Sequence, residues 1–333
     1  MNILLTGGLG FIGSHTAVEI LQNTNYRVIF LDNLYNSNPL TLDRICEISN
    51  NEKVTHKCFS ILEKDKLEEV FKNYNIDCVI HFAALKSVPE SISNPSNYYQ
   101  TNIIGSINLL DCMVKYNVKK IVFSSSATVY SDHLPPLHED MSIKLNQTNP
   151  YGTNKAMMEK IIEEYSIAYG INAINLRYFN PIGAHPSGLI GENPKKELTN
   201  LFPSLMDVLK GKKEYLHIFG DDYQTEDGSA ERDYIHICDL ASAHLCAVRY
   251  LNRFKGCIPI NVGYGYGTSV FKIIKIFEEQ NNIKIPIKIS PRREGDLPSV
   301  YCVPDKAKTL LGWKPKFTIE DACLHAYHYF SNQ

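Results

Sequence analysis

The chain has 333 residues, of which 44% are hydrophobic and 21% are charged, and its formal net charge is −2. This length suffices for one large hydrophobic core or two moderate ones, and the composition is typical of a globular protein. The near balance of charges argues against a nucleic acid or an anionic membrane surface as a partner, and no apolar run has the length of a membrane span.

Targeting and thiol chemistry can also be judged from the sequence. The N-terminal residues lack the basic segment and the cleavage site of a signal peptide. The nine cysteines are scattered without a C-x-x-C pair, which favours reduced thiols over disulfides or a zinc site. We therefore expect a cytoplasmic protein without a bound metal.

A glycine-rich turn separates a predicted strand, residues 2–6, from a predicted helix, residues 11–22. Two patterns overlap in it, Gly8-x-Gly10-x-x-Gly13 and Gly7-x-x-Gly10-x-x-Gly13. Glycines at these spacings allow a tight turn, a close approach of the backbone to a pyrophosphate, and close packing of the next helix. The pattern predicts a dinucleotide-binding turn.

The next predicted strand, residues 26–31, ends at Asp32. A carboxylate about 20 residues beyond such glycines binds the ribose hydroxyls of NAD and would repel the additional phosphate of NADP. Predicted helices and strands then alternate: helix 64–73, strand 78–84, helix 97–116 and strand 121–125. This order predicts an α/β fold, a Rossmann-like doubly wound parallel sheet with NAD as its cofactor. We interpret His81 as a core residue and place Lys86 beside the cofactor.

A candidate reaction centre follows the last of these strands. Tyr151 and Lys155 are four residues apart directly after a proline, so a helix over residues 151–169 places both side chains on one face. An ammonium beside a phenol favours the phenolate, so we expect a lowered pKa for the tyrosine. Such a tyrosine can take a proton from an alcohol. A hydroxyl of residues 124–126 can hydrogen-bond the same oxygen.

The second half of the chain differs from the first in composition and in the length of its predicted elements. Beyond a strand at residues 173–177, the chain becomes rich in turn residues and the predicted elements become shorter. We place the domain boundary near residue 180, which gives an NAD-binding domain over 1–179 and a smaller mixed α/β substrate domain over 180–333. Expected elements in the latter are helices over 200–209 and 271–280, strands over 215–219 and 283–289, and a core helix over 237–250 that returns to the first domain.

Two basic positions stand out in the second half. Arg232 and the pair Arg292-Arg293 each have an aspartate nearby in the sequence. Arginine guanidinium groups suit phosphate oxygens, and carboxylates suit ribose hydroxyls. A nucleotide diphosphate is therefore a candidate ligand, whereas the alternative is that these arginines form surface ion pairs.

Together these strings resemble the extended short-chain dehydrogenase/reductase family and, within it, the UDP-glucose (UDP-galactose) 4-epimerases. The matching strings lie at residues 6–15, 31–34, 81–83 with Lys86, 124–130, Tyr151 with Lys155, 176–186, 225–228, 232–236 and 292–296. They cover nearly the whole chain. The glycine turn and the Tyr-x-x-x-Lys pair specify the superfamily, whereas the strings at 179–186 and 292–296 are more particular to the epimerases.

The resemblance implies roles for individual residues. Tyr151 is implied as the acid/base, Lys155 as the cation that lowers its pKa, and Ser126 as the hydroxyl partner at O4 of the sugar. The NAD-binding residues implied are Gly7, Gly10, Phe11, Ile12, Gly13, Asp32, Asn33, Leu34, Tyr35, Asn36, Ser37, Ser60, Ile61, Phe82, Ala83, Ala84, Lys86, Thr101, Ser126, Tyr151, Lys155 and Phe179. The UDP-sugar residues implied are Lys86, Ser126, Tyr151, Asn180, Asn200, His217, Ile218, Phe219, Arg232, Arg293, Asp296 and Val300.

The family places a carboxylate against the adenine where this chain has Ser60-Ile61, so a weaker or backbone contact is expected there. The implied reaction is NAD-dependent oxidation at C4, rotation of the 4-keto sugar, and reduction on its opposite face. Dehydratases of the family have an acidic pair after the catalytic hydroxyl, where this chain has Ala127-Thr128. Alternatives left open are a uronate epimerase or decarboxylase and a non-catalytic NAD-binding sensor.

Two finer expectations follow from the resemblance. The family carries either a bulky tyrosine or a small residue at the position that aligns with Val300, and a small residue admits an N-acetyl group on C2. UDP-GlcNAc and UDP-GalNAc are therefore further candidate substrates, unless neighbouring side chains fill the space. The helices over 97–116 and 151–169 resemble those with which the family forms a homodimer through a four-helix contact.

Overall fold

A computed structural model describes residues 1–131, 133–145, 147–195, 200–293 and 295–333. Its central element is a seven-stranded sheet in the order β11-β6-β5-β4-β1-β2-β3, in which all neighbours are parallel. The strands are β1 (Asn2–Thr6), β2 (Arg27–Leu31), β3 (Val54–Lys57), β4 (Cys78–His81), β5 (Lys120–Ser124), β6 (Asn172–Tyr178) and β11 (Cys257–Val262). The doubly wound fold predicted from the sequence is confirmed.

The strand order reverses at β1, which pairs with β2 on one side and β4 on the other. Ligands of such sheets bind outside the carboxyl ends of the strands at this reversal. The register is level there, because Thr6 pairs with both Leu31 and His81. The residues that follow these three strands therefore open into one crevice.

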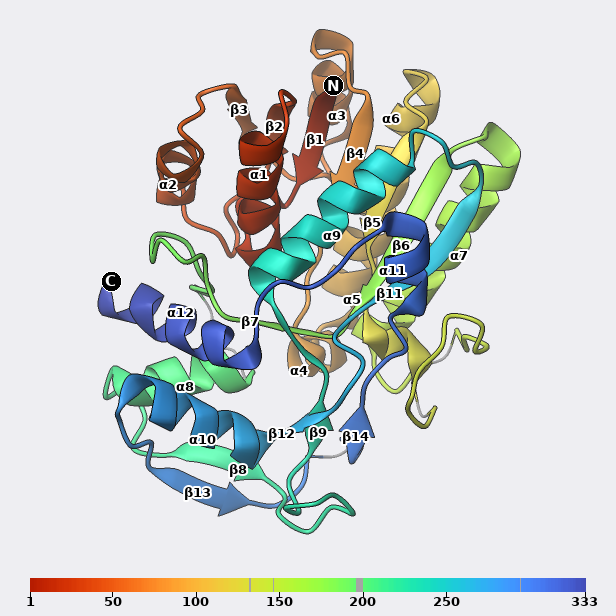
Figure 1. The fold of residues 1–333 in the computed structure, drawn as a ribbon. Helices are drawn as coiled ribbons and strands as arrows, with labels where there is room; N and C mark the ends of the chain where they lie inside the picture. The colour runs from red at the N-terminus through yellow and green to blue at the C-terminus, as the bar shows by residue number, and fades with distance from the viewer. Residues whose placement is uncertain (132, 146, 196–199, 294) are drawn as a thin grey trace.

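Helices cover both faces of the sheet (Figure 1). On one face α1 packs against α9, and together with α2 they bury one core cluster against the strands. On the other face α3, α6 and α7 bury a second cluster. The bounds are α1 (Phe11–Asn23), α2 (Leu40–Ser49), α3 (Lys64–Asn73), α4 (Val88–Ser93), α5 (Pro95–Tyr98), the π-helical turn η1 (Tyr99–Ile104), α6 (Gly105–Lys115), the 3-10 turn η2 (Ala127–Tyr130), α7 (Pro150–Tyr169), α9 (Ile237–Tyr250) and α11 (Asp305–Leu311).

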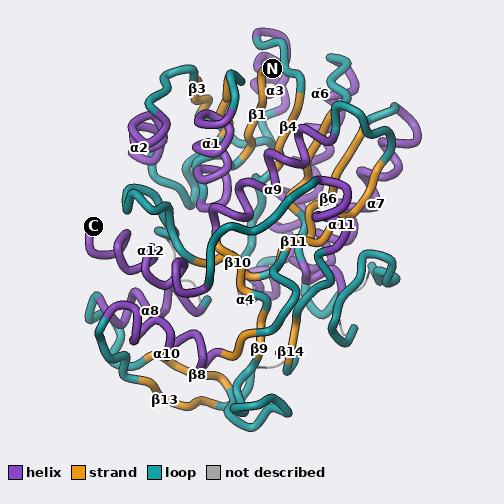
Figure 2. The backbone as a smooth tube through the Cα atoms, viewed as in Figure 1, coloured by secondary structure: helices purple, strands orange, loops and turns teal. Residues whose placement is uncertain are grey.

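The remaining elements form a smaller layer below the sheet (Figures 1 and 2). They pair as small sheets, β10 with β7, β13 with β8, and β9 between β12 and β14. A third core cluster lies among them and the helices α8, α10 and α12. The bounds are β7 (Asn180–Ile182), α8 (Leu201–Leu209), β8 (Leu216–Phe219), β9 (Glu231–Arg232), β10 (Tyr234–His236), β12 (Thr268–Ser269), α10 (Val270–Asn281), β13 (Ile287–Ser290), β14 (Ser299–Val300) and α12 (Ile319–Ser331).

The sequence pattern predicted many of the helices and strands, but not all of them. The helices predicted over 64–73 and 237–250 have those bounds in the structure, whereas the strand predicted over 78–84 ends at His81. The predicted strand over 283–289 is shorter, Ile287–Ser290. The elements β3, β11, α2 and α12 were not anticipated. In β11, Pro259 masks the strand pattern, and it is tolerated because β11 is the edge strand beside β6.

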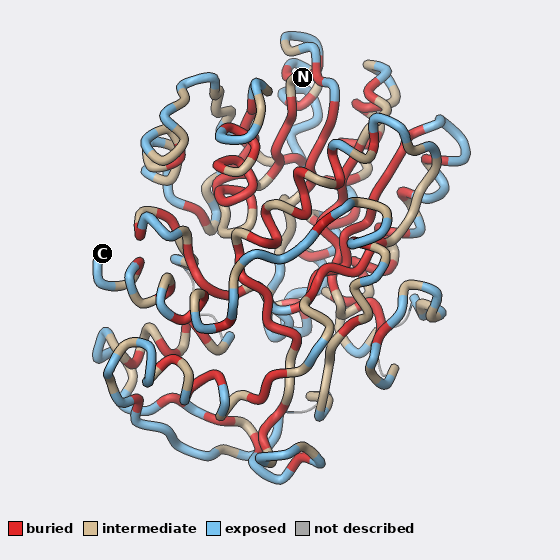
Figure 3. Tube along the Cα trace, viewed as in Figure 1, coloured by how far each residue is buried: buried red, intermediate tan, exposed pale blue. Residues whose placement is uncertain are grey.

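Burial follows the layers, with buried residues concentrated along the central strands and the inner faces of α1 and α9 (Figure 3). Within the described ranges, no helix combines the length and the apolar character needed to cross a membrane.

Candidate active site

A large cavity opens at the carboxyl ends of the central strands and reaches into the smaller layer. Its volume is about 1540 Å³, more than the roughly 300–1,000 Å³ of a pocket for one small ligand. Every residue predicted to bind NAD or UDP-sugar lines it except Leu34, whose side chain packs against the core of the central sheet. The cavity is therefore large enough for a dinucleotide and a second ligand together.

The glycine turn forms the first wall. Gly7 has a φ of +67°, and a Cβ atom there would lie 2.7 Å from the backbone nitrogen of Ala83. A Cβ atom on Gly13 would lie 2.7 Å from the carbonyl oxygen of Gly7. The helix α1 begins after Gly10 without a capping side chain and without an acidic residue in its first turn. Its unpaired N–H groups therefore fit the phosphates of a dinucleotide.

Asp32 closes the same wall at the end of β2. Its carboxylate is buried and accepts hydrogen bonds from the backbone N–H groups of Leu9 at 3.0 Å and Leu34 at 2.9 Å, and from the Ser37 hydroxyl at 2.7 Å. These bonds fix the orientation of the carboxylate at the cavity wall. The cradle of glycines and this carboxylate fit NAD, as the sequence predicted.

The helix α7 supplies Tyr151 and Lys155. It begins where the Asn149 side chain accepts a hydrogen bond from Gly152 N at 2.9 Å, and Pro150 occupies its first turn. The Lys155 ammonium nitrogen lies 5.8 Å from the centroid of the Tyr151 ring and donates to Ser124 O at 2.5 Å. The Ser126 hydroxyl hydrogen-bonds Tyr151, so the three predicted catalytic residues, Ser126, Tyr151 and Lys155, lie together in the cavity.

The charge states of this pair differ from the expectation. Burial raises the pKa of Tyr151, and the hydrogen bond with Ser126 opposes this effect only in part. Burial also lowers the pKa of Lys155 to about 7, although the Glu159 carboxylate raises it. The prediction that the pKa of Tyr151 falls is thus wrong for the protein groups alone. Burial raises this pKa by more than Lys155 can lower it, because Lys155 is itself only partly protonated near neutral pH.

His81 has the core role expected of it. Its Nδ1 lies 2.6 Å from the Thr6 hydroxyl and its Nε2 lies 2.7 Å from the Ser106 hydroxyl. The Ser106 hydroxyl donates to Asn102 O, so it accepts from His81 Nε2–H. The ring is neutral, because burial lowers its pKa to about 3.

The second wall comes from the smaller layer. Arg232 donates to Leu297 O at 2.9 Å and lies 3.5 Å from an Asp296 carboxylate oxygen. The Arg293 guanidinium carbon lies 3.8 Å from the centroid of the Phe219 ring. Asn200 is the N-cap residue of α8, and His217 Nδ1 lies 2.8 Å from the Ser290 hydroxyl. Glu294, which belongs to the matching string at 292–296, lies outside the described residues.

Comparisons with known proteins agree with this geometry. Residues 3–263 match the model of the NAD dependent epimerase/dehydratase family. The chain belongs to this family.

The similarity extends over more than nine-tenths of the length of the relatives named here. The chain is 44% identical over 332 residues to a UDP-glucose 4-epimerase of Schizosaccharomyces pombe, an alignment that covers 98% of this chain and 93% of that protein. Its identity to the UDP-glucose 4-epimerase of Yersinia enterocolitica is 46% over 331 residues, covering 98% and 96%. The crystal structure of UDP-glucose 4-epimerase from Bifidobacterium longum in complex with NAD+ and UDP matches with a TM-score of 0.94 and 41% identity, covering 100% and 98%. The resemblance indicated by the sequence is confirmed.

Sequence reasoning missed a segment of the epimerase that crosses the cavity. We call residues 189–195 the strap; most of them line the cavity. Lys195 Nζ donates to Leu34 O at 2.7 Å, Arg44 donates to Leu189 O at 3.1 Å, and Glu192 pairs with Lys86 at 3.1 Å. The mixed composition of the strap, with one glycine and one proline among its seven residues, carries no signal for these contacts.

Proposed function

We propose that this epimerase interconverts UDP-galactose and UDP-glucose by NAD-dependent oxidation at C4, rotation of the 4-keto sugar, and reduction on its opposite face. The observation that carries the proposal is that Tyr151, Lys155 and Ser126 meet where the wall that fits NAD joins the wall that fits a nucleotide diphosphate. Bound NAD supplies the hydride acceptor and donor for C4.

Side chains of the protein transfer the proton, stabilise charge and bind the diphosphate. Tyr151 takes the proton from O4 and later returns it, with the Ser126 hydroxyl hydrogen-bonded to the same oxygen. In its protonated form Lys155 carries positive charge beside the phenol, which favours the phenolate against the burial that raises the pKa of Tyr151. Arg232 and Arg293 bind the diphosphate, which anchors the ligand while the sugar turns. We assign NAD to residues 1–179 with the returning helix α9, and the UDP-sugar to the rest of residues 180–333, from which β11 and α11 also pack with the central sheet.

The test is the formation of UDP-glucose from UDP-galactose by the purified protein without added NAD. We expect turnover, because the cofactor is regenerated in each cycle and remains in the cavity. The Tyr151→Phe variant should lose activity by about 10²- to 10⁴-fold, the contribution of a positioned acid/base, while retaining NAD. No turnover by the unchanged protein, even with NAD supplied, would contradict the proposal and turn attention to uronate sugars.

We also propose turnover of UDP-GlcNAc and UDP-GalNAc. Val300 ends β14, is half-buried, and lines the cavity, so its small side chain leaves space on the sugar side. We expect Val300→Tyr to abolish conversion of UDP-GalNAc and to retain conversion of UDP-galactose. A protein that converts UDP-galactose but never UDP-GalNAc would overturn this extension.

A homodimer in the cytoplasm is a further proposal. Exposed apolar side chains lie along η1 and α7, the region expected to form the dimer contact: Tyr99, Ile104, Ile167 and Tyr169. Burial of such side chains favours association. Light scattering after size-exclusion chromatography should give twice the monomer mass, and a monomeric mass at micromolar concentration would contradict the proposal.

A further inference from the structure

The helix α7 presents a third side chain to the serine segment that contains Ser126. Tyr151, Lys155 and Glu159 are spaced by four residues and therefore share one face of the helix. Each contacts a different serine: Tyr151 contacts Ser126, Lys155 donates to Ser124 O, and Glu159 accepts from the Ser125 hydroxyl. The reaction as described uses only the first two of the three.

Glu159 is held in place by a buried ion pair with Arg177 on β6. The exposed fractions of the two side chains are 8% and 4%. The guanidinium is bidentate: Nη2 donates to Oε2 at 2.6 Å and Nε donates to Oε1 at 3.0 Å. A buried pair with such geometry restricts both side chains, and removing one partner leaves an uncompensated charge.

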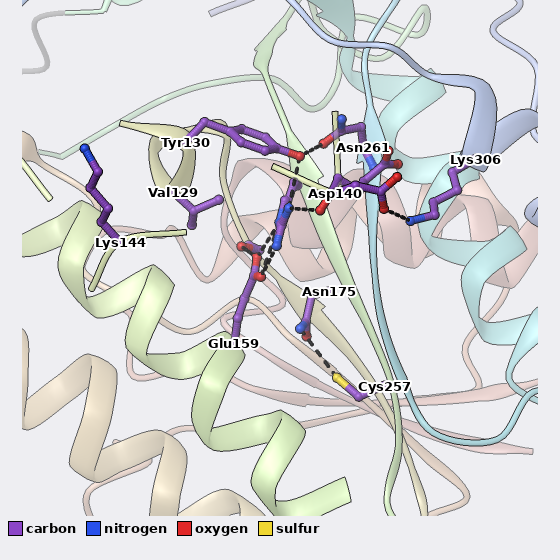
Figure 4. A network of polar contacts seen from close by, with 12 residues as sticks. Val129, Tyr130, Asp140, Lys144, Glu159, Asn175, Cys257, Asn261 and Lys306 are labelled. Carbon is purple, nitrogen blue, oxygen red and sulfur yellow. Dashed lines mark hydrogen bonds and ion pairs between the residues drawn. The ribbon is translucent and has the colours of Figure 1, made fainter. Parts of the chain in front are cut away.

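The network continues to the far end of the same segment (Figure 4). Arg177 Nη1 donates to the Tyr130 hydroxyl at 3.1 Å, and this hydroxyl donates to Asn261 Oδ1 at 2.6 Å. Tyr130 ends the η2 turn, whose N-cap residue is Ser126. The Glu159–Arg177 pair therefore holds the chain on both sides of Ser126. Glu159 accepts a hydrogen bond from the Ser125 hydroxyl, and the Arg177 guanidinium donates one to the Tyr130 hydroxyl.

Among the described residues, few charged or titratable groups lie around Lys155. His81 on β4 is neutral, and Phe123 and Ser124 on β5 offer a ring and a carbonyl. On α7 itself stand Tyr151 and Glu159, and on β6 stand Tyr178, whose hydroxyl bonds the Ser124 hydroxyl, and Arg177. Of these groups, Glu159 is the one that favours the ammonium form of Lys155 against burial.

We propose that Glu159 is a positioning residue for the epimerase reaction. It fixes the catalytic serine segment through Ser125, and its negative charge keeps Lys155 cationic inside a desolvated site. Arg177 holds the carboxylate in the orientation that serves both tasks. This inference rests on the proposed epimerase function, because it assigns Glu159 a task within that reaction.

The experiment is the pH profile of kcat for conversion of UDP-galactose by the NAD-containing protein and its Glu159→Gln variant. Without the carboxylate, Lys155 loses its proton at lower pH, so the alkaline limb should move to lower pH by about one unit, an approximately tenfold loss at the pH of that limb. Glu159→Asp keeps the charge and should return the limb towards its original position. Glu163→Gln is the matched control, since Glu163 is on the same helix but exposed and paired with Lys160, and it should move nothing.

A second variant separates charge from folding. Glu159→Gln leaves the Arg177 guanidinium buried without its partner, which destabilises the fold. Glu159→Gln combined with Arg177→Met removes that cation, so we expect a higher melting temperature than for Glu159→Gln alone, with the alkaline limb still displaced. A uniform loss of kcat at every pH, with the limb unmoved in both variants, would overturn the inference. Inactivity of the unchanged protein would instead contradict the proposed function.

Discussion

The cavity has two walls of different construction. On the NAD side, Gly7, Asp32 and Phe82 stand directly after β1, β2 and β4, whose level register brings them together. On the UDP-sugar side, Arg232, Arg293 and Phe219 belong to separate small sheets and loops that meet through side chains. The first wall is built from residues that directly follow neighbouring strands of the central sheet, whereas the second is built from side chains of segments that are further apart in the chain.

This difference decides what a substitution can damage. A change in the first wall displaces backbone that the sheet cannot move, so both cofactor binding and folding are affected. A change in the second wall removes one side chain and leaves its neighbours in place. A change of pH and substitutions on each side of the cavity test this contrast.

Acid should destabilise the fold, because buried histidines with lowered pKa values lie in both regions, His236 in the smaller layer among them. In the sheet region His15, His81 and His244 are buried, and desolvation lowers their pKa values to about 3, 3 and 4. In the unfolded chain they take up protons near pH 6.5, so the unfolded state binds more protons and the free energy of unfolding falls as pH drops from about 6.5 towards 4. At pH 5.5 each histidine costs about 1.4 kcal/mol, or about 4 kcal/mol together. Urea denaturation at pH 7.5 and 5.5 measures this loss, and equal midpoints would contradict it.

Gly7→Ala should release NAD. The new Cβ atom meets the Ala83 backbone at 2.7 Å, where the sheet leaves no room to move. We expect NAD affinity to fall by roughly 5- to 150-fold, the effect of about 1–3 kcal/mol of overpacking. The NAD content after gel filtration measures it. Gly170→Ala is the matched control, because Gly170 has the same φ of +67° but open space around it. Equal NAD content in both variants would indicate that the clash is relieved.

Arg293→Ala should act on substrate binding alone. Removing a guanidinium from a phosphate contact costs about 1.5–3 kcal/mol, so KM for UDP-galactose should rise by about tenfold or more with NAD content unchanged. Arg292→Ala is the control, since Arg292 pairs with Asp222 at 2.7 Å and does not line the cavity. If the Arg293 variant also lost NAD, the two walls would not be independent.

Lys195→Met should have the smallest effect. The strap is joined to the NAD side by exposed contacts such as Lys195 Nζ to Leu34 O, and contacts of this kind contribute about 0–1 kcal/mol each. We expect NAD to dissociate at most about fivefold faster in dilution experiments. Lys284→Met removes the exposed partner of Glu278, and because neither residue lines the cavity, the rate should stay unchanged. A rate equal to that control would show that the strap does not retain the cofactor.

The sequence predicted the residues of the NAD side better than those of the UDP-sugar side, for a physical reason. The glycine turn, Asp32 and the Tyr151–Lys155 pair are local patterns, since a turn, a strand end and a helix face depend on residues close in the chain. The contacts of the second wall join residues far apart, such as Arg232 with Asp296. Only the resemblance to a family placed them together, and no periodicity in the chain would have done so.

The sequence by itself determined the βαβ order, the NAD-type turn and the helix face that carries Tyr151, because each follows from short-range geometry. The tertiary structure alone decided that β11 closes the sheet, that Glu159 meets Arg177, and that burial raises the pKa of Tyr151. Burial and partners from distant segments set those properties, and a linear pattern carries no record of the distances that govern desolvation and charge.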